Sequence, residues 1–168
     1  MIIETERLEL VPLSLNQLKL WVAEEAALEK ELDFTYKGQP LTGFMLRNIQ
    51  EEIEAIEKDE PNYLFYTTWL MILKSDRMAV GSAAFKGSPN QNGEIEIGYG
   101  LGEEFEHHGY MTEAVEELCK WGLNQKNVKQ ILAETDVEGD ASERVLQRNG
   151  FERYKTGDSS WWRLPRSS

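Results

Sequence analysis

The strongest structural signal in the chain is the sequence YGLGEEFEHHGYMTEA, which runs from Tyr99 to Ala114. It predicts a strand, a glycine-containing loop and the first turn of an amphipathic helix. The first N–H groups of a helix lack partners within it and lie at the positive end of its dipole. Such a turn can hold an anion, for example the diphosphate of a nucleotide-like cofactor, with backbone groups alone. The alternative is an ordinary strand-to-helix turn in which Gly109 only relieves backbone strain.

Two better-known phosphate-binding motifs do not fit this stretch. It contains no Gly-Lys-Ser or Gly-Lys-Thr, which excludes a Walker loop. Gly98, Gly100 and Gly102 lack the spacing of the dinucleotide-binding fingerprint. The choice between an anion cradle and a plain turn therefore stays open on these residues alone.

Hydrophobic periodicity predicts the elements before and after this stretch. Ser14 is a candidate helix cap, and Asn149-Gly150 is a helix end. The expected strands are 6–13 (stopping near Pro12), 63–74, 78–85, 94–101, 130–137, 150–154 and 161–164, and the expected helices are 15–25, 42–58, 110–124 and 141–148. Antiparallel hairpins thus precede a strand–helix–strand crossover, which predicts an α+β fold with helices on both faces of one sheet.

The helix expected at 110–124 is clearly two-sided. Its inner face carries Ala114, Val115, Leu118 and Gly122, and we expect its outer face, with Glu113, Glu116, Glu117 and Lys120, to meet water. Cys119 lies beside the inner face and is expected to be a packing residue.

Length and composition indicate an ordinary globular protein. With 168 residues we expect one domain, 1–168, and one cysteine excludes an internal disulfide and favours a reducing compartment. We expect a cytoplasmic protein, because no secretory signal and no membrane-spanning apolar run is present. The formal net charge of -12 argues against a nucleic-acid partner. It favours cationic amines or basic peptides at an acidic cleft, or serves solubility alone.

The run Glu106-His107-His108-Gly109-Tyr110-Met111-Thr112-Glu113-Ala114 resembles the acetyl-CoA loop of the GNAT acetyltransferases. Its Gly-Tyr-x-Thr-Glu-Ala part is similar to the subgroup that acetylates the N-termini of ribosomal proteins. Residues 4–8, 96–99 and 141–151 resemble the opening strand, the fourth strand and the last helix with its following strand, in the same order. Glu106, His107, Met111 and Gly139 depart from the family pattern.

The resemblance implies a GNAT-like central sheet, mixed but mostly antiparallel and twisted, with six to seven strands. It implies acetyl-CoA as co-substrate, a primary amine as acceptor, and direct transfer without a covalent enzyme intermediate. The family's fourth and fifth strands, here 94–101 and 130–137, splay to hold the pantetheine arm. The implied cofactor-binding residues are Ile97, Tyr99, Leu101, His107, His108, Gly109, Tyr110, Met111 and Thr112.

Two side chains are candidates for proton transfer. Glu96 is the candidate general base, because it lies on the strand expected beside the thioester. Its alternative role is an outward residue of the alternating pattern Glu94-Ile95-Glu96-Ile97. Ser142 is the candidate acid for the leaving thiolate, with Tyr154 as the weaker choice. We also expect Asp140 to cap this helix and Glu143 to complete a capping box, which leaves Ser142 free.

The remaining motifs carry less chemistry. His107 and His108 are adjacent, and no further histidine exists to complete a site, so we expect no metal. Trp161-Trp162 predicts core packing in a final hairpin, with one ring lining the acceptor cleft as the alternative. A homodimer stays open, since the aromatic strand at 63–74 could provide surface. The rival functions are a non-catalytic acyl-CoA-binding or regulatory domain of the same fold and a small nucleotide-binding module.

Overall fold

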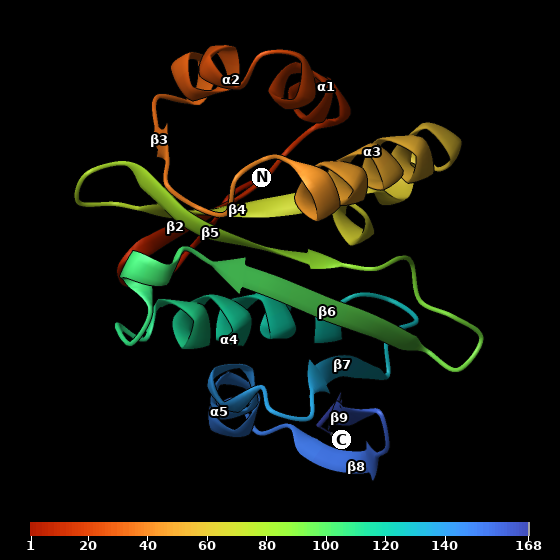
Figure 1. Ribbon diagram of the computed structural model, residues 1–168. Helices are drawn as coiled ribbons and strands as arrows, with labels where there is room; N and C mark the ends of the chain where they lie inside the picture. The colour runs from red at the N-terminus through yellow and green to blue at the C-terminus, as the bar shows by residue number, and fades with distance from the viewer. Residues whose placement is uncertain (168) are drawn as a thin grey trace.

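The computed structural model describes residues 1–167, which form one twisted sheet with helices on both faces (Figure 1). The strands are β1 Ile3–Glu4, β2 Leu8–Pro12, β3 Thr35–Tyr36, β4 Thr68–Leu73, β5 Met78–Phe85, β6 Glu94–Leu101, β7 Gln130–Asp136, β8 Glu152–Thr156 and β9 Ser159–Pro165. The helices are α1 Leu15–Ala23, α2 Glu25–Leu32, α3 Gly43–Lys58, α4 Tyr110–Leu123 and α5 Asp140–Arg148, with short 3-10 helices η1 Glu60–Phe65 and η2 Glu103–Phe105.

The strands lie in the order β1-β2-β4-β5-β6-β7-β9-β8, and β3 pairs with β5. Only β3 with β5 and β6 with β7 are parallel among the pairs in residues 1–167, and the others are antiparallel. The predicted α+β fold with a mixed, mostly antiparallel sheet is confirmed. The structure has nine strands in this part of the chain, more than the six to seven expected, because β1 and β3 are two-residue strands too short to show periodicity.

Helices cover both faces of the sheet, so its central strand is buried on both sides (Figure 1). Trp69 and Met71 of β4 pack into the core under α4, whereas Leu70 and Ile72 pack into the core under α1, α2 and α3. This explains why β4 is continuously apolar from Trp69 to Leu73 rather than alternating. None of the helices in residues 1–167 is long and apolar enough to cross a bilayer.

Two segments differ from expectation between residues 24 and 66. The helix α2, Glu25–Leu32, was not predicted; with Leu28 as its fully buried residue, it offers little periodic signal. The expected strand at 63–74 begins only at Thr68, because Tyr63–Phe65 belong to η1. Pro61 stands in the first turn of η1, where its fixed φ favours a helical start.

The helix α4 buries Ala114, Val115, Leu118, Cys119 and Gly122, as its period predicts. A Cβ on Gly122 would lie 3.1 Å from Ile95 and 3.2 Å from Ile131, so the glycine lets α4 approach both β6 and β7. The expectation that Glu113 faces water is wrong. Its carboxylate instead accepts hydrogen bonds from the segment that precedes β2.

The start of α5 also differs from the prediction. Gly139 is the N-cap and offers no side-chain cap, and Asp140 is the first helical residue, so Asp140 is not the cap and no capping box forms. The cause is a turn in which the Gly139 amide donates to the Asp136 carbonyl, which starts the helix one residue early. Gly150 ends α5 with a φ of 86°, as predicted for a left-handed terminus.

Glu52 is a half-buried carboxyl on α3 that faces β4. The Thr68 hydroxyl donates to its two oxygens at 2.8 Å and 3.1 Å. Desolvation raises the pKa of Glu52 from 4.5 to about 8, and the bonds from Thr68 offset only part of this rise. The folded protein therefore keeps a proton on Glu52 over a pH range in which the unfolded chain releases it.

This proton makes the stability of the protein fall as pH rises. Between about pH 4.5 and pH 8 the wild-type free energy of unfolding should decrease by at most about 1.4 kcal/mol per pH unit. Glu52→Gln, which keeps an oxygen for Thr68, should remove this slope, whereas Glu54→Gln on the exposed side of α3 should leave it. Urea unfolding at four pH values from 5 to 8 measures the slope. An unchanged slope in the Glu52 variant would contradict the assignment.

Candidate active site

The site begins where β6 and β7 part. These parallel strands pair only over Glu94–Glu96 with residues 130–132. Beyond Glu96, β6 continues along β5 through Leu101, and β7 continues along β9 through Asp136. The facing edges of the two strands are therefore free of each other over the remainder of their length.

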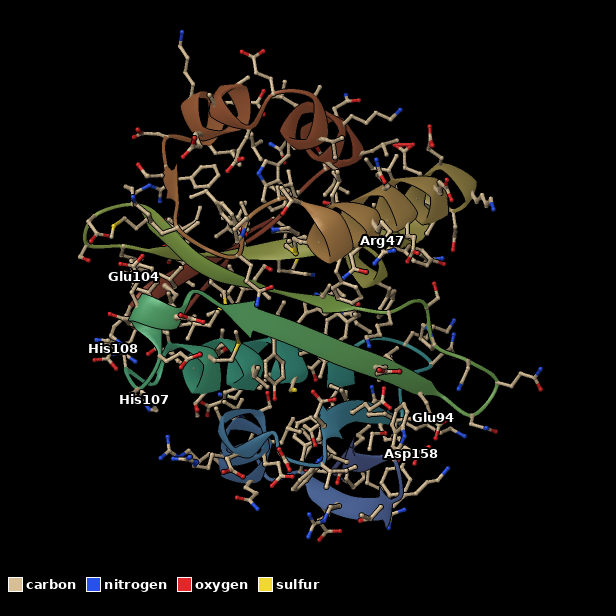
Figure 2. The ribbon with its side chains drawn as sticks, viewed as in Figure 1. Arg47, Glu94, Glu104, His107, His108 and Asp158 are labelled. Atoms are coloured by element: carbon tan, nitrogen blue, oxygen red, sulfur yellow. The ribbon has the colours of Figure 1, made fainter. Side chains whose placement is uncertain are left out.

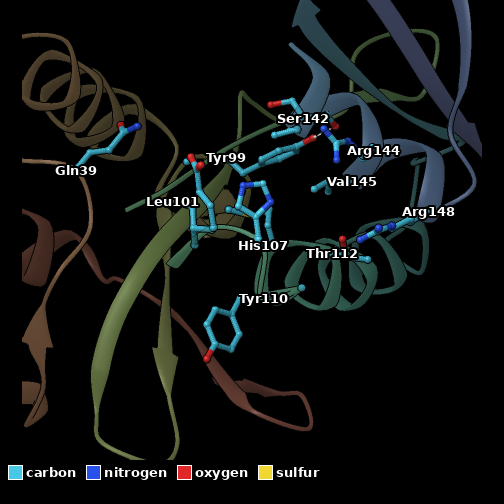
Figure 3. A pocket seen from close by; sticks show the side chains of 15 residues that line it. Gln39, Tyr99, Leu101, His107, Tyr110, Thr112, Ser142, Arg144, Val145 and Arg148 are labelled. Carbon is cyan, nitrogen blue, oxygen red and sulfur yellow. Dashed lines mark hydrogen bonds between the residues drawn. The ribbon is translucent and has the colours of Figure 1, made fainter. Parts of the chain in front are cut away.

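A cavity of about 390 Å³ lies at the open end of this split (Figure 3). One wall is the turn into α4, another is α5, and Gln39 stands on the opposite side from α5. The lining residues are Gln39, Tyr99, Gly100, Leu101, Glu106, His107, Gly109, Tyr110, Met111, Thr112, Ala141, Ser142, Arg144, Val145 and Arg148.

The turn before α4 presents a row of free backbone donors. His107 and Gly109 both have left-handed backbone, with φ of 66° and 79°, and Gly109 is the N-cap without a side-chain cap. The first helical bond runs from the Glu113 amide to the Gly109 carbonyl at 3.1 Å. Among residues 1–167 the amides of residues 107–112 have no hydrogen-bond acceptor. Six consecutive N–H groups at the positive end of α4 suit an anion.

The other wall carries positive charge that the sequence analysis missed. Arg144 and Arg148 are one helical turn apart on α5, and both line the cavity (Figure 3). Glu106 is the one acidic residue of the lining. The signal in the sequence was two arginines spaced i, i+4 on a strongly amphipathic helix. Guanidinium groups bind phosphate by paired hydrogen bonds, so this wall favours a phosphorylated ligand.

Most of the expected cofactor-binding residues meet at this cavity. The lining includes Tyr99, Leu101, His107, Gly109, Tyr110, Met111 and Thr112, together with Ser142. Ile97 does not contribute its side chain, which is 2% exposed in the core under α4. The imidazole of His108 also turns away, because its Nδ1 lies 3.1 Å and 2.8 Å from the carbonyls of Phe105 and Glu106.

Glu96 lies outside the lining of the cavity. Its neighbours Ile95 and Ile97 point into the core under α4, so Glu96 projects from the opposite face of β6. There its carboxylate forms an ion pair with Lys86, with an Nζ–Oε2 distance of 2.9 Å. Figure 2 shows Glu94 at the start of β6 and His107 and His108 beyond its other end.

Ser142 lies in the first turn of α5, beside the cavity. Its backbone carbonyl accepts a hydrogen bond of 3.0 Å from the Tyr99 hydroxyl, which joins β6 to α5 across the split. Desolvation, with a smaller contribution from Cys119, raises the pKa of Tyr99, so its hydroxyl keeps the proton that this bond needs. This bond uses the backbone carbonyl of Ser142 and not its hydroxyl.

The other candidates lie outside the lining. Tyr154 is 42% exposed on β8, with the Arg163 guanidinium 5.3 Å from its ring centre. Trp162 is a core residue whose indole donates to Thr135 at 3.0 Å, and Trp161 is half-buried. Within residues 1–167 no three His, Cys, Asp or Glu side chains are grouped as metal ligands.

Comparison with known proteins gives a consistent family. The sequence model of the acetyltransferase (GNAT) domain matches residues 7–152. The uncharacterized N-acetyltransferase YjdG of Bacillus subtilis (strain 168) is 26% identical over 162 residues, which cover 96% of each chain. The uncharacterized N-acetyltransferase p20 of Bacillus licheniformis is 30% identical over 83 residues, or 49% of this chain and 47% of the relative.

Solved structures share the fold at low sequence identity. RimL, a ribosomal L7/L12 alpha-N-protein acetyltransferase in complex with coenzyme A, has a TM-score of 0.69 at 17% identity, covering 98% of both chains. A GNAT-family acetyltransferase from Bacillus anthracis has a TM-score of 0.65 at 18% identity, covering 99% of both. With the family match spanning the split strands, the turn and α5, the chain belongs to the GNAT acetyltransferase family.

Proposed function

We propose that the protein is an N-acetyltransferase that passes the acetyl group of acetyl-CoA directly to a primary amine. The observation that carries this proposal is the cavity at the β6–β7 split, bounded by six free amides on one side and by Arg144 and Arg148 on the other. Those donors match a ligand with several phosphate groups, and the family makes coenzyme A that ligand.

The residues of the cavity fit the parts of acetyl-CoA in order. The amides of residues 107–112 would hold the pyrophosphate, and Arg144 and Arg148 would supply the positive charge that balances it. The pantetheine arm would lie in the split, where the free edge of β6 near Ile97, Tyr99 and Leu101 offers backbone groups as to an added strand. Bound in this way, acetyl-CoA supplies a thioester carbonyl next to the point where β6 and β7 part.

Proton transfer then falls to the chain's own residues. Glu96 takes a proton from the acceptor ammonium, directly or through water, so that the neutral nitrogen can attack the thioester carbonyl carbon. As the C–S bond breaks, the Ser142 hydroxyl donates a hydrogen bond to the departing sulfur, which takes up the second proton that the attacking nitrogen loses, and Glu96 releases the first proton to water. Glu96, which activates the amine, lies on β6, and Ser142, which assists the departing sulfur, lies on α5. The hydrogen bond between Tyr99 and Ser142 holds these two elements together.

In the proposed reaction the acceptor ammonium is recognised at the Lys86–Glu96 ion pair. The Lys86 side chain is 58% exposed, and exposed ion pairs are weak. An acceptor ammonium can replace the Lys86 ammonium at the Glu96 carboxylate, because the displaced Lys86 ammonium is exposed and is hydrated by water. The net charge of -12 attracts such cations from solution. RimL is described as an alpha-N-protein acetyltransferase, so peptide N-termini belong among the acceptors to test.

A thiol-release assay with acetyl-CoA and a panel of amines tests the proposal. The panel contains peptides with N-terminal Ser or Ala, spermidine, free amino acids and an aminoglycoside. We expect coenzyme A to be released in step with one acetylated amine, and calorimetry at low salt to show binding of coenzyme A. Binding without release for any amine would favour the non-catalytic acyl-CoA-binding domain, which the position of Glu96 outside the cavity supports. A protein that neither binds coenzyme A nor releases it from acetyl-CoA would overturn both the enzyme and the acyl-CoA-binding domain.

A second prediction concerns the backbone of the turn. Gly109→Ala places a Cβ on a residue with φ of 79°, at 3.4 Å from Arg7 Nη2. Keeping this left-handed backbone with a side chain should destabilise the turn by about 1–2 kcal/mol, and we expect the adjacent amides to tilt. The tilted amides should bind phosphate less well, so the Kd for coenzyme A should rise by roughly fivefold to tenfold, or about 1–1.4 kcal/mol of binding free energy. Gly157→Ala is the control, because a Cβ there meets no atom within 4 Å. Calorimetric titration of both variants measures the difference, and equal affinities would exclude a role for this turn.

A third prediction tests the general base. Glu96→Gln should lower kcat by on the order of 100-fold while leaving the KM for acetyl-CoA unchanged. Glu94→Gln is the matched control on the same face of β6, where the carboxylate accepts bonds from Asn90 and Gln130. Steady-state kinetics with the best amine of the panel compares the two variants. Unchanged turnover in the Glu96 variant would remove Glu96 from the mechanism.

A further inference from the structure

The turn at residues 106–109 is held by Arg7, a residue near the N-terminus of the chain. Arg7 donates from Nε to Glu113 Oε1 at 2.9 Å and from Nη1 to the His108 carbonyl at 2.9 Å. The guanidinium also lies 4.5 Å from the centre of the Tyr110 ring. One side chain thus contacts the turn, the first residue of α4 and the first turn of that helix.

Glu113 is the anchor of this arrangement. Its Oε2 accepts a hydrogen bond from the backbone amide of Arg7 at 2.8 Å and another from the Thr5 hydroxyl. Partial burial by itself would raise the pKa of Glu113, but the hydrogen bonds from Thr5 and Arg7 outweigh it, and the pKa is lowered. The carboxylate therefore stays ionised and keeps both ends of the contact in place.

Arg7 itself projects from a firmly held point of the sheet. The turn before β2 is closed by bonds from the Thr5 amide to the Leu8 carbonyl at 2.9 Å and from the Leu8 amide to Thr5 Oγ1 at 3.0 Å. Lys74 holds it from the other side, since its amide donates to the Arg7 carbonyl at 2.9 Å and its Nζ to the Thr5 carbonyl at 2.7 Å. Leu8 is fully buried.

Two carbonyls of the turn, those of Glu106 and His108, are engaged on the protein side. The Glu106 carbonyl contacts His108 Nδ1 at 2.8 Å, and the His108 carbonyl contacts Arg7. The His108 ring is stacked on Tyr110, with ring centres 5.3 Å apart and planes 5° apart. In a planar trans peptide the C=O and the following N–H point in opposite directions. Holding these two carbonyls therefore aims the amides of His107 and Gly109 away from the bracing side chains.

We propose that Arg7 is a positioning residue, which fixes the turn at residues 106–109 so that its amides face the cofactor pyrophosphate before the cofactor binds. The inference rests on the proposed function, because it presumes that coenzyme A is the ligand. Arg7 does not line the cavity, so it acts through the turn and through Tyr110, which do. A turn that is already ordered loses less conformational freedom on binding, which strengthens affinity.

Two substitutions of Arg7 test the inference against one control. Arg7→Met removes the side-chain bonds to Glu113 and His108 but keeps the bond from the backbone amide to Glu113, and Arg7→Lys can keep only one of the two side-chain bonds. Arg77→Met is the matched control, because Arg77 also joins a carboxylate, Glu9, to main-chain carbonyls, those of Leu32 and Asp33, away from the turn. Thermal melting shows that each variant is folded.

The first readout needs no ligand. In the cofactor-free protein, ¹⁵N relaxation should give residues 107–112 order parameters near 0.85 in the wild type and below about 0.6 in Arg7→Met, with Arg77→Met unchanged. Rigid amides at this turn in Arg7→Met would overturn the inference. If Arg7→Met fails to fold, the same comparison is made with Arg7→Lys, for which we expect an intermediate loss of order.

The second readout is affinity. The Kd for coenzyme A and the KM for acetyl-CoA should both rise roughly tenfold in Arg7→Met and less in Arg7→Lys, with kcat nearly unchanged. An equal loss in Arg77→Met, or a loss in kcat alone, would overturn the positioning role. Absence of coenzyme A binding by the wild type would instead overturn the proposed function, so the two failures are distinguishable.

Discussion

The structure depends on the parting of two parallel strands after three paired residues. β6 stays with β5 and β7 stays with β9, so neither can satisfy the facing edge of the other beyond Glu96. An open strand edge inside a folded domain needs hydrogen-bonding partners, and an extended ligand can supply them. α4 packs against both strands through Gly122, and the Tyr99–Ser142 bond spans the gap. The split is therefore held open by well-packed elements on both sides.

The alternation of β6 divides the chemistry between two faces. Ile95 and Ile97 face the core under α4, whereas Glu94 and Glu96 face the opposite side. The charged side chains are separated in the same way. Arg144 and Arg148 line the cavity, whereas the carboxylates of Glu94 and Glu96 lie on the opposite face of β6. In the proposed reaction an anionic cofactor and a cationic acceptor would thus approach from separate sides, and each would meet a surface of opposite charge.

Local signals in the sequence were enough for the fold class, the two-sided helix α4 and the glycine-containing turn. Signals that depend on distant residues were not. Nothing near Glu113 shows that its partner is Arg7, so its side chain was expected in water. The same holds for α5, where a turn at Asp136 displaced the cap from Asp140, and for α2, whose helical pattern is too short to stand out. Which way Arg144 and Arg148 point depends on where α5 docks, which no local pattern records.

The contact between Arg7 and Glu113 also constrains the order of events during synthesis. Its two partners are 106 positions apart, so the loop that it closes includes most of the sheet. The contact is impossible until α4 has left the ribosome, although β2 and Arg7 were made long before. The nascent chain therefore carries Arg7 without its partner until α4 has been made, and the turn before α4 gains its support only when the N-terminal strand and α4 have docked on one sheet.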